Sequence, residues 1–211
     1  MYLPKHFEQP NSEAIARLLV AHPLATVVWQ SADGLTAEHL PLILDRGEHD
    51  GPYGTLRGHV ARANPVWREA AGGAVMAAFQ GPQAYVTPSW YPSKAANAKV
   101  VPTWNYAVVH LHGKLRVIED AAWLRVLVGR LTDTHEATRA HRWQVDDAPA
   151  DYVAQMLGAI VGIEIEVTRL QAKWKVSQNR SASDRAGVAA GLDSLANEQA
   201  LAMATLVRSD G

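Results

Sequence analysis

The feature that most constrains the fold is a strict alternation of apolar and polar residues. Within residues 108–117, Val109, Leu111, Leu115 and Val117 fall on one face, and residues 163–167 repeat the pattern over a shorter length. A period of two residues is typical of a β-strand with one buried and one polar face. We expect Glu164 and Glu166 to be solvated and the polar face of 108–117 to be solvated or to form an interface. That polar face carries His110, His112, Lys114 and Arg116.

Further strands and a few helices follow from turn residues and periodicity. A helix is expected to begin near residues 11–13 and to end before Pro23, and strands 25–30 and 35–44 form a hairpin around the turn at 31–34. The other expected strands are 53–59, 74–80 and 83–87, the last two separated by Gly81-Pro82. The other expected helices are 64–67, 119–131, 151–157 and 185–207, the last broken at Gly191.

This order of elements predicts a mainly β, or α+β, fold. Because almost every strand can pair with an antiparallel neighbour, we expect a closed or partly closed antiparallel barrel with peripheral helices. Neither GxGxxG nor a Walker A sequence occurs, so the standard dinucleotide and nucleoside triphosphate motifs are absent.

Composition excludes several classes of protein. The chain of 211 residues has a formal net charge of −1, which gives no general attraction for nucleic acid. It has no cysteine, so disulfides and thiolate chemistry are excluded. Neither a signal-peptide core nor an apolar run of membrane-spanning length is present. We therefore expect a cytoplasmic protein without a membrane segment.

Residues 81–106 carry an unusual mixture of side chains. Five aromatic residues lie among prolines, serines and lysines, and the prolines interrupt any regular strand. Flat rings, hydroxyls, an amide and a cation together suit a planar, anionic ligand. The alternative is a loop whose aromatic side chains cover the core. The candidate binding residues are Ser89, Trp90, Lys94, Trp104 and Asn105.

Two other segments are candidate anion sites. In the first, 58–65, His59 and Arg62 follow a strand and could donate to a phosphate, although the segment could equally be a solvated turn capped by Asn64. In the second, 173–180, cations and amides follow a strand and could contact a heteroaromatic ring and its phosphate. The alternative is a surface strand end with extended lysines. The candidates in this segment are Lys175, Gln178, Asn179 and Arg180.

Other catalytic patterns are weak. His110 and His112 share a strand face, but nothing in the sequence completes a metal site around them, and we predict no metal. No GxSxG motif indicates a serine nucleophile.

Several long motifs resemble one family. These are MYLPKHF, HLPLIL, GTLRGHVARANPVW, FQGPQAYVTPSWYPSK, KVVPTWNYAVVHLHGKL and VGIEIEVTRLQAKWKVSQNR. From residue 1 to about 192 the chain is similar to the PaiB-type transcriptional regulators of the FMN-binding split-barrel superfamily, which also holds pyridoxamine-phosphate oxidases and flavin reductases. The resemblance implies one domain over 1–192, with 193–211 as its helical tail.

The resemblance also implies a six-stranded antiparallel split barrel that forms a homodimer, with FMN between the subunits. It makes His59 and Arg62 the phosphate residues, with Ser89 and Lys94 behind them. It places Trp104 and Asn105 near the isoalloxazine ring or the dimer seam. Residues 174–180 correspond to a tryptophan followed by basic and amide residues that lie near the ring in the oxidases.

The function implied by the family is negative transcriptional regulation, exerted through flavin or redox sensing. The near-zero net charge argues against strong direct DNA binding, so a DNA or regulatory partner has little support in the sequence. The alternatives are a flavin-dependent oxidoreductase of unknown substrate and a haem-binding or haem-degrading protein. Whether the chain is an enzyme stays open.

Overall fold

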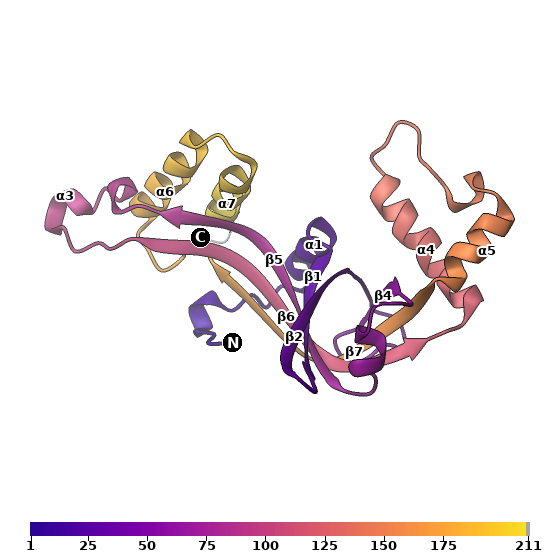
Figure 1. The fold of residues 1–211 in the computed structure, drawn as a ribbon. Helices are drawn as coiled ribbons and strands as arrows, with labels where there is room; N and C mark the ends of the chain where they lie inside the picture. Colours follow the sequence, from indigo (N-terminus) through magenta and orange to yellow (C-terminus); the bar gives the residue numbers. More distant parts are fainter. Residues whose placement is uncertain (210–211) are drawn as a thin grey trace. The chain divides into compact units, whose positions relative to one another are not determined.

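A computed structural model describes residues 1–209 and shows a mixed α+β fold built on one seven-stranded sheet (Figure 1). The strand order is β2-β1-β5-β6-β7-β4-β3, and the pairs β1–β2, β1–β5, β3–β4 and β4–β7 are antiparallel. The mixed fold and the antiparallel pairing were expected. The strands are β1 (Leu24–Ser31), β2 (Gly34–Pro41), β3 (Ile43–Asp45), β4 (Thr55–Ala61), β5 (Ala74–Val86), β6 (Thr103–Ile118) and β7 (Ile160–Lys175).

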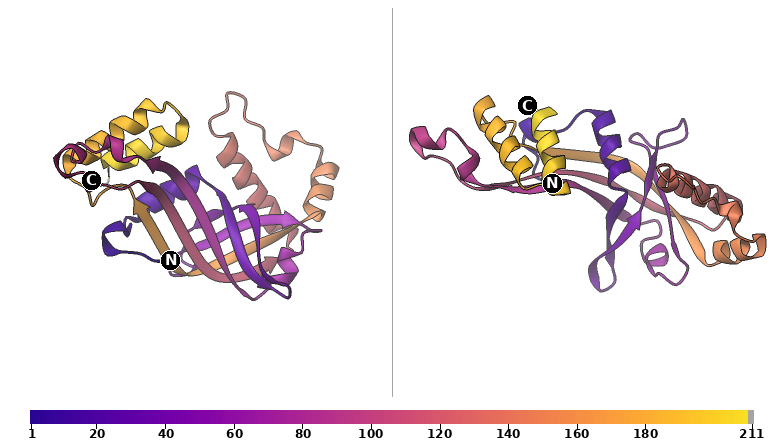
Figure 2. Two further views of the ribbon diagram at one scale, coloured as in Figure 1. Left: turned by 60° about the vertical axis from the view of Figure 1, so that its left-hand side comes forward. Right: turned by 90° about the horizontal axis from the view of Figure 1, so that it is seen from above.

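Helices connect and flank these strands (Figure 2). The α-helices are α1 (Ser12–Ala21), α2 (Val66–Glu69), α3 (Lys94–Asn97), α4 (Ala121–Glu136), α5 (Ala150–Gly158), α6 (Ala182–Ser194) and α7 (Glu198–Ser209). Short 3₁₀ helices occupy η1 (Lys5–Phe7), η2 (Pro88–Trp90) and η3 (Val145–Asp147). Helix α1 begins where the sequence predicted, because the Asn11 side chain accepts from the amides of Glu13 and Ala14.

The chain forms two compact units. Unit 1 contains Met1–His22, Phe79–His110 and Gln171–Gly211, and unit 2 contains Pro23–Ala78 and Leu111–Leu170. The predicted tail, 193–211, belongs to unit 1, and its last two residues lie outside the described part of the chain.

Unit 2 is closed by a bend at Leu42. Strands β2 and β3 stand at opposite edges of the sheet order, yet this one residue separates them in the chain. The Leu42 amide donates to the Pro23 carbonyl at 3.0 Å, and its side chain is 1% exposed. The sheet must therefore curve until its two edges meet, as in a split barrel.

The same bend explains the strand number. The sequence predicted one strand over 35–44, whereas Pro41 and Leu42 divide this segment into β2, paired with β1, and β3, paired with β4. The sheet consequently has seven strands and not the expected six.

Helix α4 covers part of the outer face of unit 2. Its buried side chains Leu124, Leu127 and Leu131 recur at helical spacing, as predicted. A Cβ added to Gly162 of β7 would lie 2.3 Å from the ring of Trp123, so this glycine lets the helix approach the strand closely.

In unit 1, helix α6 packs against the segment that follows β5. The Trp90 ring lies against α6, where a Cβ added at Gly191 would be 2.2 Å from a ring carbon and one at Gly187 would be 2.1 Å from the Trp90 carbonyl oxygen. Ser93 adds a second link, because its amide and hydroxyl donate to the two carboxylate oxygens of Asp184 at 3.0 and 2.9 Å.

Two sequence predictions about breaks were wrong. Strand β5 continues through Gly81-Pro82. Only the stretch Val75–Ala78 of β5 pairs with β1, so Pro82, which has no amide hydrogen, removes no hydrogen bond to β1. Gly191 lies inside α6, and the helical break instead falls at Ala196, whose φ is +51°.

We expect Gly113→Ala to destabilise unit 2 by about 3 kcal/mol. A Cβ there would lie 2.1 Å from the Glu166 carbonyl oxygen, and backbone cannot move aside easily. The matched control is Gly158→Ala, where nothing lies within 4 Å and the change should be neutral or stabilising. Urea denaturation followed by circular dichroism measures both, and equal stabilities of the two variants would contradict the packing described.

Candidate functional site

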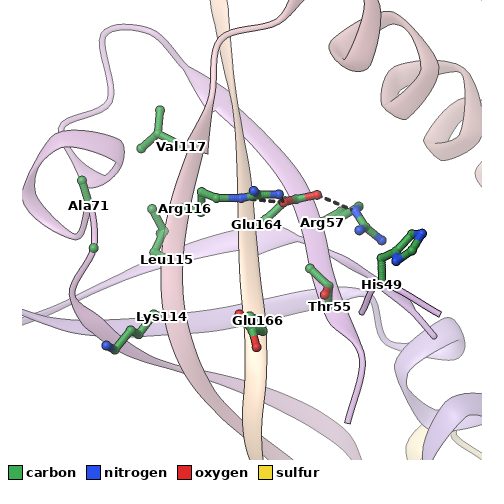
Figure 3. Close-up of a pocket in the computed structure, with 11 residues that line it drawn as sticks. His49, Thr55, Arg57, Ala71, Lys114, Leu115, Arg116, Val117, Glu164 and Glu166 are labelled. Carbon is green, nitrogen blue, oxygen red and sulfur yellow. Dashed lines mark hydrogen bonds and ion pairs between the residues drawn. The ribbon is translucent and has the colours of Figure 1, made fainter. Parts of the chain in front are cut away.

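Three adjacent strands of unit 2 present a polar outer face (Figure 3). In the β4–β7 register, Arg57 is opposite Glu164 and Thr55 is opposite Glu166. From β6, Arg116 reaches the same carboxylate, donating from Nε to Glu164 Oε2 at 3.0 Å. Arg57 and Arg116 thus hold Glu164 from its two sides.

Arg57 is the centre of an ionic network. Its three nitrogens each bind a different carboxylate: Nε to Glu164 at 2.7 Å, Nη1 to Asp45 at 2.6 Å and Nη2 to Asp50 at 2.8 Å. Arg130 of α4 binds Asp45 as well. The network therefore joins β3, the loop before β4, β4, β7 and α4.

Glu164 is thus not solvated as the sequence predicted, because it is 4% exposed and accepts from two arginines. Glu166, in contrast, is exposed as expected. The alternation of residues 163–167 specified which side chains share a face, but it could not show that charged groups from β4 and β6 would cover one of them.

The network lowers the pKa of two of its carboxyl groups, those of Asp45 and Asp50. Burial raises the pKa of Asp45, but hydrogen bonds from Arg130 and Arg57 outweigh that effect and leave the pKa below its ordinary value. For Asp50, burial again raises the pKa. Hydrogen bonds from the Gly47 amide, Thr55 and Arg57 outweigh burial, so the pKa is below its ordinary value.

A cavity of about 500 Å³ opens on this face. Its charged lining residues carry both signs, and Leu115, Val117, Ala71 and Gly72 form the apolar and backbone walls. Since the deepest charges are paired with each other, the cavity has little net charge with which to attract an anion. The charged and titratable lining residues are His49, Arg57, Lys114, Arg116, Glu164 and Glu166.

The two predicted phosphate residues lie on and just after β4, in unit 2. Arg62 is engaged by protein groups: Nε donates to the Gly158 carbonyl at 3.0 Å, Nη1 to Glu119 at 2.6 Å and Nη2 to the Ile160 carbonyl at 3.2 Å. His59 is different, because its Nδ1 is buried and has no hydrogen-bond partner among the described residues. Burial lowers the pKa of His59, which favours the neutral imidazole.

The other predicted residues belong to unit 1, where the ends of β6 and β7 bring several of them together. Lys175 Nζ donates to the Trp104 carbonyl at 2.5 Å and to Thr103 Oγ1. Asn105 is buried and donates from Nδ2 to Ser177 Oγ at 2.9 Å. The side chain of Trp104 is 54% exposed, and its ring makes an edge-to-face contact with Tyr85.

The turn after β7 is shaped by Gln178. Its amide nitrogen donates to the Trp174 carbonyl at 2.6 Å, and its amide oxygen accepts from the Val176 amide at 2.8 Å. Arg180 lies over the ring of Tyr91 at 5.0 Å. Asn179, Ser89 and Lys94 are exposed, whereas Trp90 is half-buried against α6.

Lys173 begins the predicted segment 173–180 but was not among its candidate binding residues. This lysine is 6% exposed, and its ammonium donates to the Tyr2 carbonyl at 3.0 Å among the rings of Tyr2, Phe7 and Tyr106. Its position two residues before Lys175 was the only signal, because residues two apart in a strand share a face.

Lys173, Lys175 and Arg180 form a group of cations. Burial lowers the pKa of Lys175, and repulsion from Lys173 and Arg180 lowers it further. No carboxylate contributes to this shift among the causes found in the described part of the chain. The arrangement contrasts with Arg57, whose charge is balanced by three acids, and it is suited to an anionic ligand.

Comparison with known proteins identifies the class. Residues 1–169 match the family described as "Putative FMN-binding domain". The chain is also 36% identical to "Protease synthase and sporulation protein PAI 2" of Bacillus subtilis, over 98% of this chain and 96% of that protein. This is a split-barrel protein of the FMN-binding class. The chain belongs to the FMN-binding domain family, whose cofactor is FMN, and it is similar to the Bacillus protein named above.

Solved structures show the same fold. The flavocytochrome Anf3 from Azotobacter vinelandii has a TM-score of 0.60 and 15% identity, covering 82% of this chain and 72% of that one. The FAD and heme binding protein from Mycobacterium smegmatis has a TM-score of 0.59 and 19% identity, covering 79% and 72%. Separately, no helix among residues 1–209 is long and apolar enough to cross a membrane.

The residues present fit FMN by their chemistry. A flavin nucleotide needs cationic or neutral donors for its phosphate and a flat surface for its ring. The cations at the end of β7 and the exposed Trp104 ring supply these in unit 1, and the unpaired Nδ1 of His59 supplies a buried donor or acceptor in unit 2. The family match ends at residue 169, so the β7 cations lie outside it.

We expect Arg57→Met to destabilise the protein by about 3–5 kcal/mol, because it leaves three carboxylates without their shared cation. The matched variant is Arg116→Met, whose side chain is 72% exposed and which binds Glu164 alone, and it should cost about 1 kcal/mol. Urea denaturation of both variants tests the network. Similar losses of unfolding free energy in the two variants would show that Arg57 contributes no more to stability than a surface arginine.

Acid should weaken unit 2 through Asp45 and Asp50. Their folded-state pKa values are lowered, so the stability they contribute is full above the ordinary aspartate pKa and is lost as pH falls through the lowered values. Unfolding free energies measured from neutral pH down to about pH 3 should decline, the ordinary value being about 3.9. Asp45→Asn should decline less steeply, and an unchanged slope would rule this residue out as a source of the acid sensitivity.

Proposed function

We propose that this protein is a homodimeric FMN-binding redox protein, and that any regulatory role is exerted through the state of its flavin. The observation that carries the proposal is the group of cations at the end of β7. Lys175 is held in place by Thr103 and by the backbone carbonyl of Trp104, whose side chain is 54% exposed, and it is repelled by Lys173 and Arg180.

An anionic ligand would relieve this repulsion. Lys175 and Arg180 would hold a negative group of the flavin nucleotide, and the exposed face of Trp104 would contact its ring. Asn105 and Gln178 have a supporting role, because both are bonded to the protein and fix the ends of β6 and β7 around the lysine. Bound FMN would supply electron or hydride transfer, and the protein would supply orientation and charge.

His59 and Arg62 of unit 2 are proposed as the alternative phosphate contact to Lys175 and Arg180 of unit 1, and they differ in how well they suit that role. The buried Nδ1 of His59 has a bond to offer, whereas the three donor nitrogens of Arg62 are already used. Ser89 and Lys94 are exposed and complete the set of proposed contacts from the 81–106 segment, and Asn179 completes that of the β7 turn.

Regulation through flavin fits the charge of the chain better than strong direct DNA binding. The formal net charge is −1, which does not favour a phosphate backbone. The name of the Bacillus relative, a protease synthase and sporulation protein, supports a regulatory role. If duplex DNA is bound through phosphates, affinity must fall steeply as salt is added.

A haem ligand is a second candidate, favoured by the two fold neighbours, which are a flavocytochrome and an FAD- and haem-binding protein. No group of three or more His, Cys, Asp or Glu residues in the described part of the chain is placed to hold a metal ion. A Soret band on adding hemin, removed in a His110→Ala and His112→Ala double variant, would favour this candidate.

Titration with FMN, followed by quenching of flavin fluorescence, tests the proposal. Lys175→Met should weaken FMN binding by about 1–3 kcal/mol through loss of a charge-assisted contact. Because the pKa of Lys175 is lowered, its charge is lost at a lower pH than that of an ordinary lysine, and FMN affinity should begin to fall correspondingly early as pH rises.

Lys5→Met is the matched control, since Lys5 is exposed in the same unit and the substitution removes the same charge. His59→Ala and Arg62→Ala are titrated in parallel, with thermal unfolding to separate lost binding from lost stability. Equal FMN affinity of wild type, Lys175→Met and Lys5→Met would show that the flavin does not bind at the end of β7. Absence of FMN quenching by wild type would overturn the proposal as a whole.

A further inference from the structure

A second cavity lies in unit 1, at the edge of β5 near the connection between α6 and α7. Its volume is about 320 Å³, which is at the small end of the range for ligand sites and suits a single ring system. The largest side chains around it are Tyr85, Trp90 and Leu195. Two aromatic walls and one aliphatic wall are the lining expected for a flat ring.

The aromatic walls are held in place by contacts on their far sides. The Trp90 ring lies on Gly191 of α6, where an added Cβ would come within 2.2 Å of a ring carbon, and the Trp90 backbone carbonyl lies against Gly187. Tyr85 makes an edge-to-face contact with Trp104, with 6.0 Å between ring centres and 69° between ring planes. The aromatic walls of the cavity are therefore in place before any ligand binds.

The polar groups around the cavity are neutral. Asn197 accepts from the Ala200 amide at 2.9 Å with Oδ1, which caps α7, and its Nδ2 has no partner within residues 1–209. Gln83 contributes a second side-chain amide. None of the described residues around this cavity is charged. Amides that both donate and accept match a ring edge that carries its own amide or lactam.

We propose that this cavity binds an uncharged planar heteroaromatic ring that bears an amide or lactam edge. The faces of the ring would contact Tyr85, Trp90 and Leu195. The polar edge of the ring would form hydrogen bonds with the side-chain amides of Asn197 and Gln83. Nicotinamide, uracil and the isoalloxazine ring of a flavin share this chemistry. The inference differs from the proposed FMN contacts at Lys175, because this site has no cation and would select for the ring alone.

The test uses nicotinamide, uridine and riboflavin as separate probes of the full chain. Binding is followed by the NMR shift of the Trp90 indole N–H signal, which the Trp90→Phe variant assigns. At least one probe should shift this signal in a saturable way. The probe that binds most tightly identifies the source of the ring, and riboflavin would show that the flavin itself enters the cavity.

Two variants and a matched control locate the binding. Leu195→Trp fills the cavity and should abolish the shift, whereas Leu201→Trp changes a similarly exposed leucine of α7 outside the cavity lining and should leave it unchanged. Asn197→Asp keeps the oxygen that caps α7 but removes the amide donor, and should weaken binding about tenfold.

The proposal is overturned if none of the three probes shifts the Trp90 signal at millimolar concentration, or if Leu195→Trp binds as wild type does. These outcomes are separate from a failure of FMN to bind near Lys175, because Lys175→Met should leave nicotinamide and uridine binding unchanged. Circular dichroism of each variant establishes that it is folded.

Discussion

The closure of unit 2 at Leu42 is the constraint on which the rest of that unit depends. One residue joins strands at opposite edges of the sheet, and it fits only because Gly58 faces it: a Cβ there would lie 2.5 Å from a Leu42 methyl group and 2.9 Å from the Pro41 carbonyl oxygen. Closure places β3 beside β4, and this brings Asp45 to Arg57. The ionic network thus depends on the bend at Leu42.

The cations of this protein occupy two contrasting environments. Arg57 has three carboxylates within hydrogen-bonding distance, so its charge is used within the fold. Lys175 has the opposite surroundings, with two other cations near it and backbone and hydroxyl oxygens as its partners. A balanced charge is costly to leave without its partners, and an unbalanced charge is what a ligand can neutralise. This difference, more than cavity size, separates a structural cluster from a binding one.

Periodicity and turn residues were enough to predict most of the strands and α1, because each depends on neighbours in sequence. The division of 35–44 at Leu42 and the burial of Glu164 could not be predicted, since both depend on β4, which pairs from a distance. The same applies to the candidate site. The sequence indicated Lys175 and Arg180 as basic residues after a strand, but it could not show Lys173 beneath aromatic rings or Tyr85 against Trp104.

The enclosure of Lys173 has a practical consequence. Its amine is covered by aromatic side chains and bonded to the carbonyl of Tyr2, a residue that is itself 84% exposed. Reagents that acylate lysines would reach it only when the first residues of the chain lift away from β7. The extent of its acylation, read by mass spectrometry against an exposed lysine such as Lys5, would therefore count how often that segment opens, without any label or probe being added to the protein beforehand.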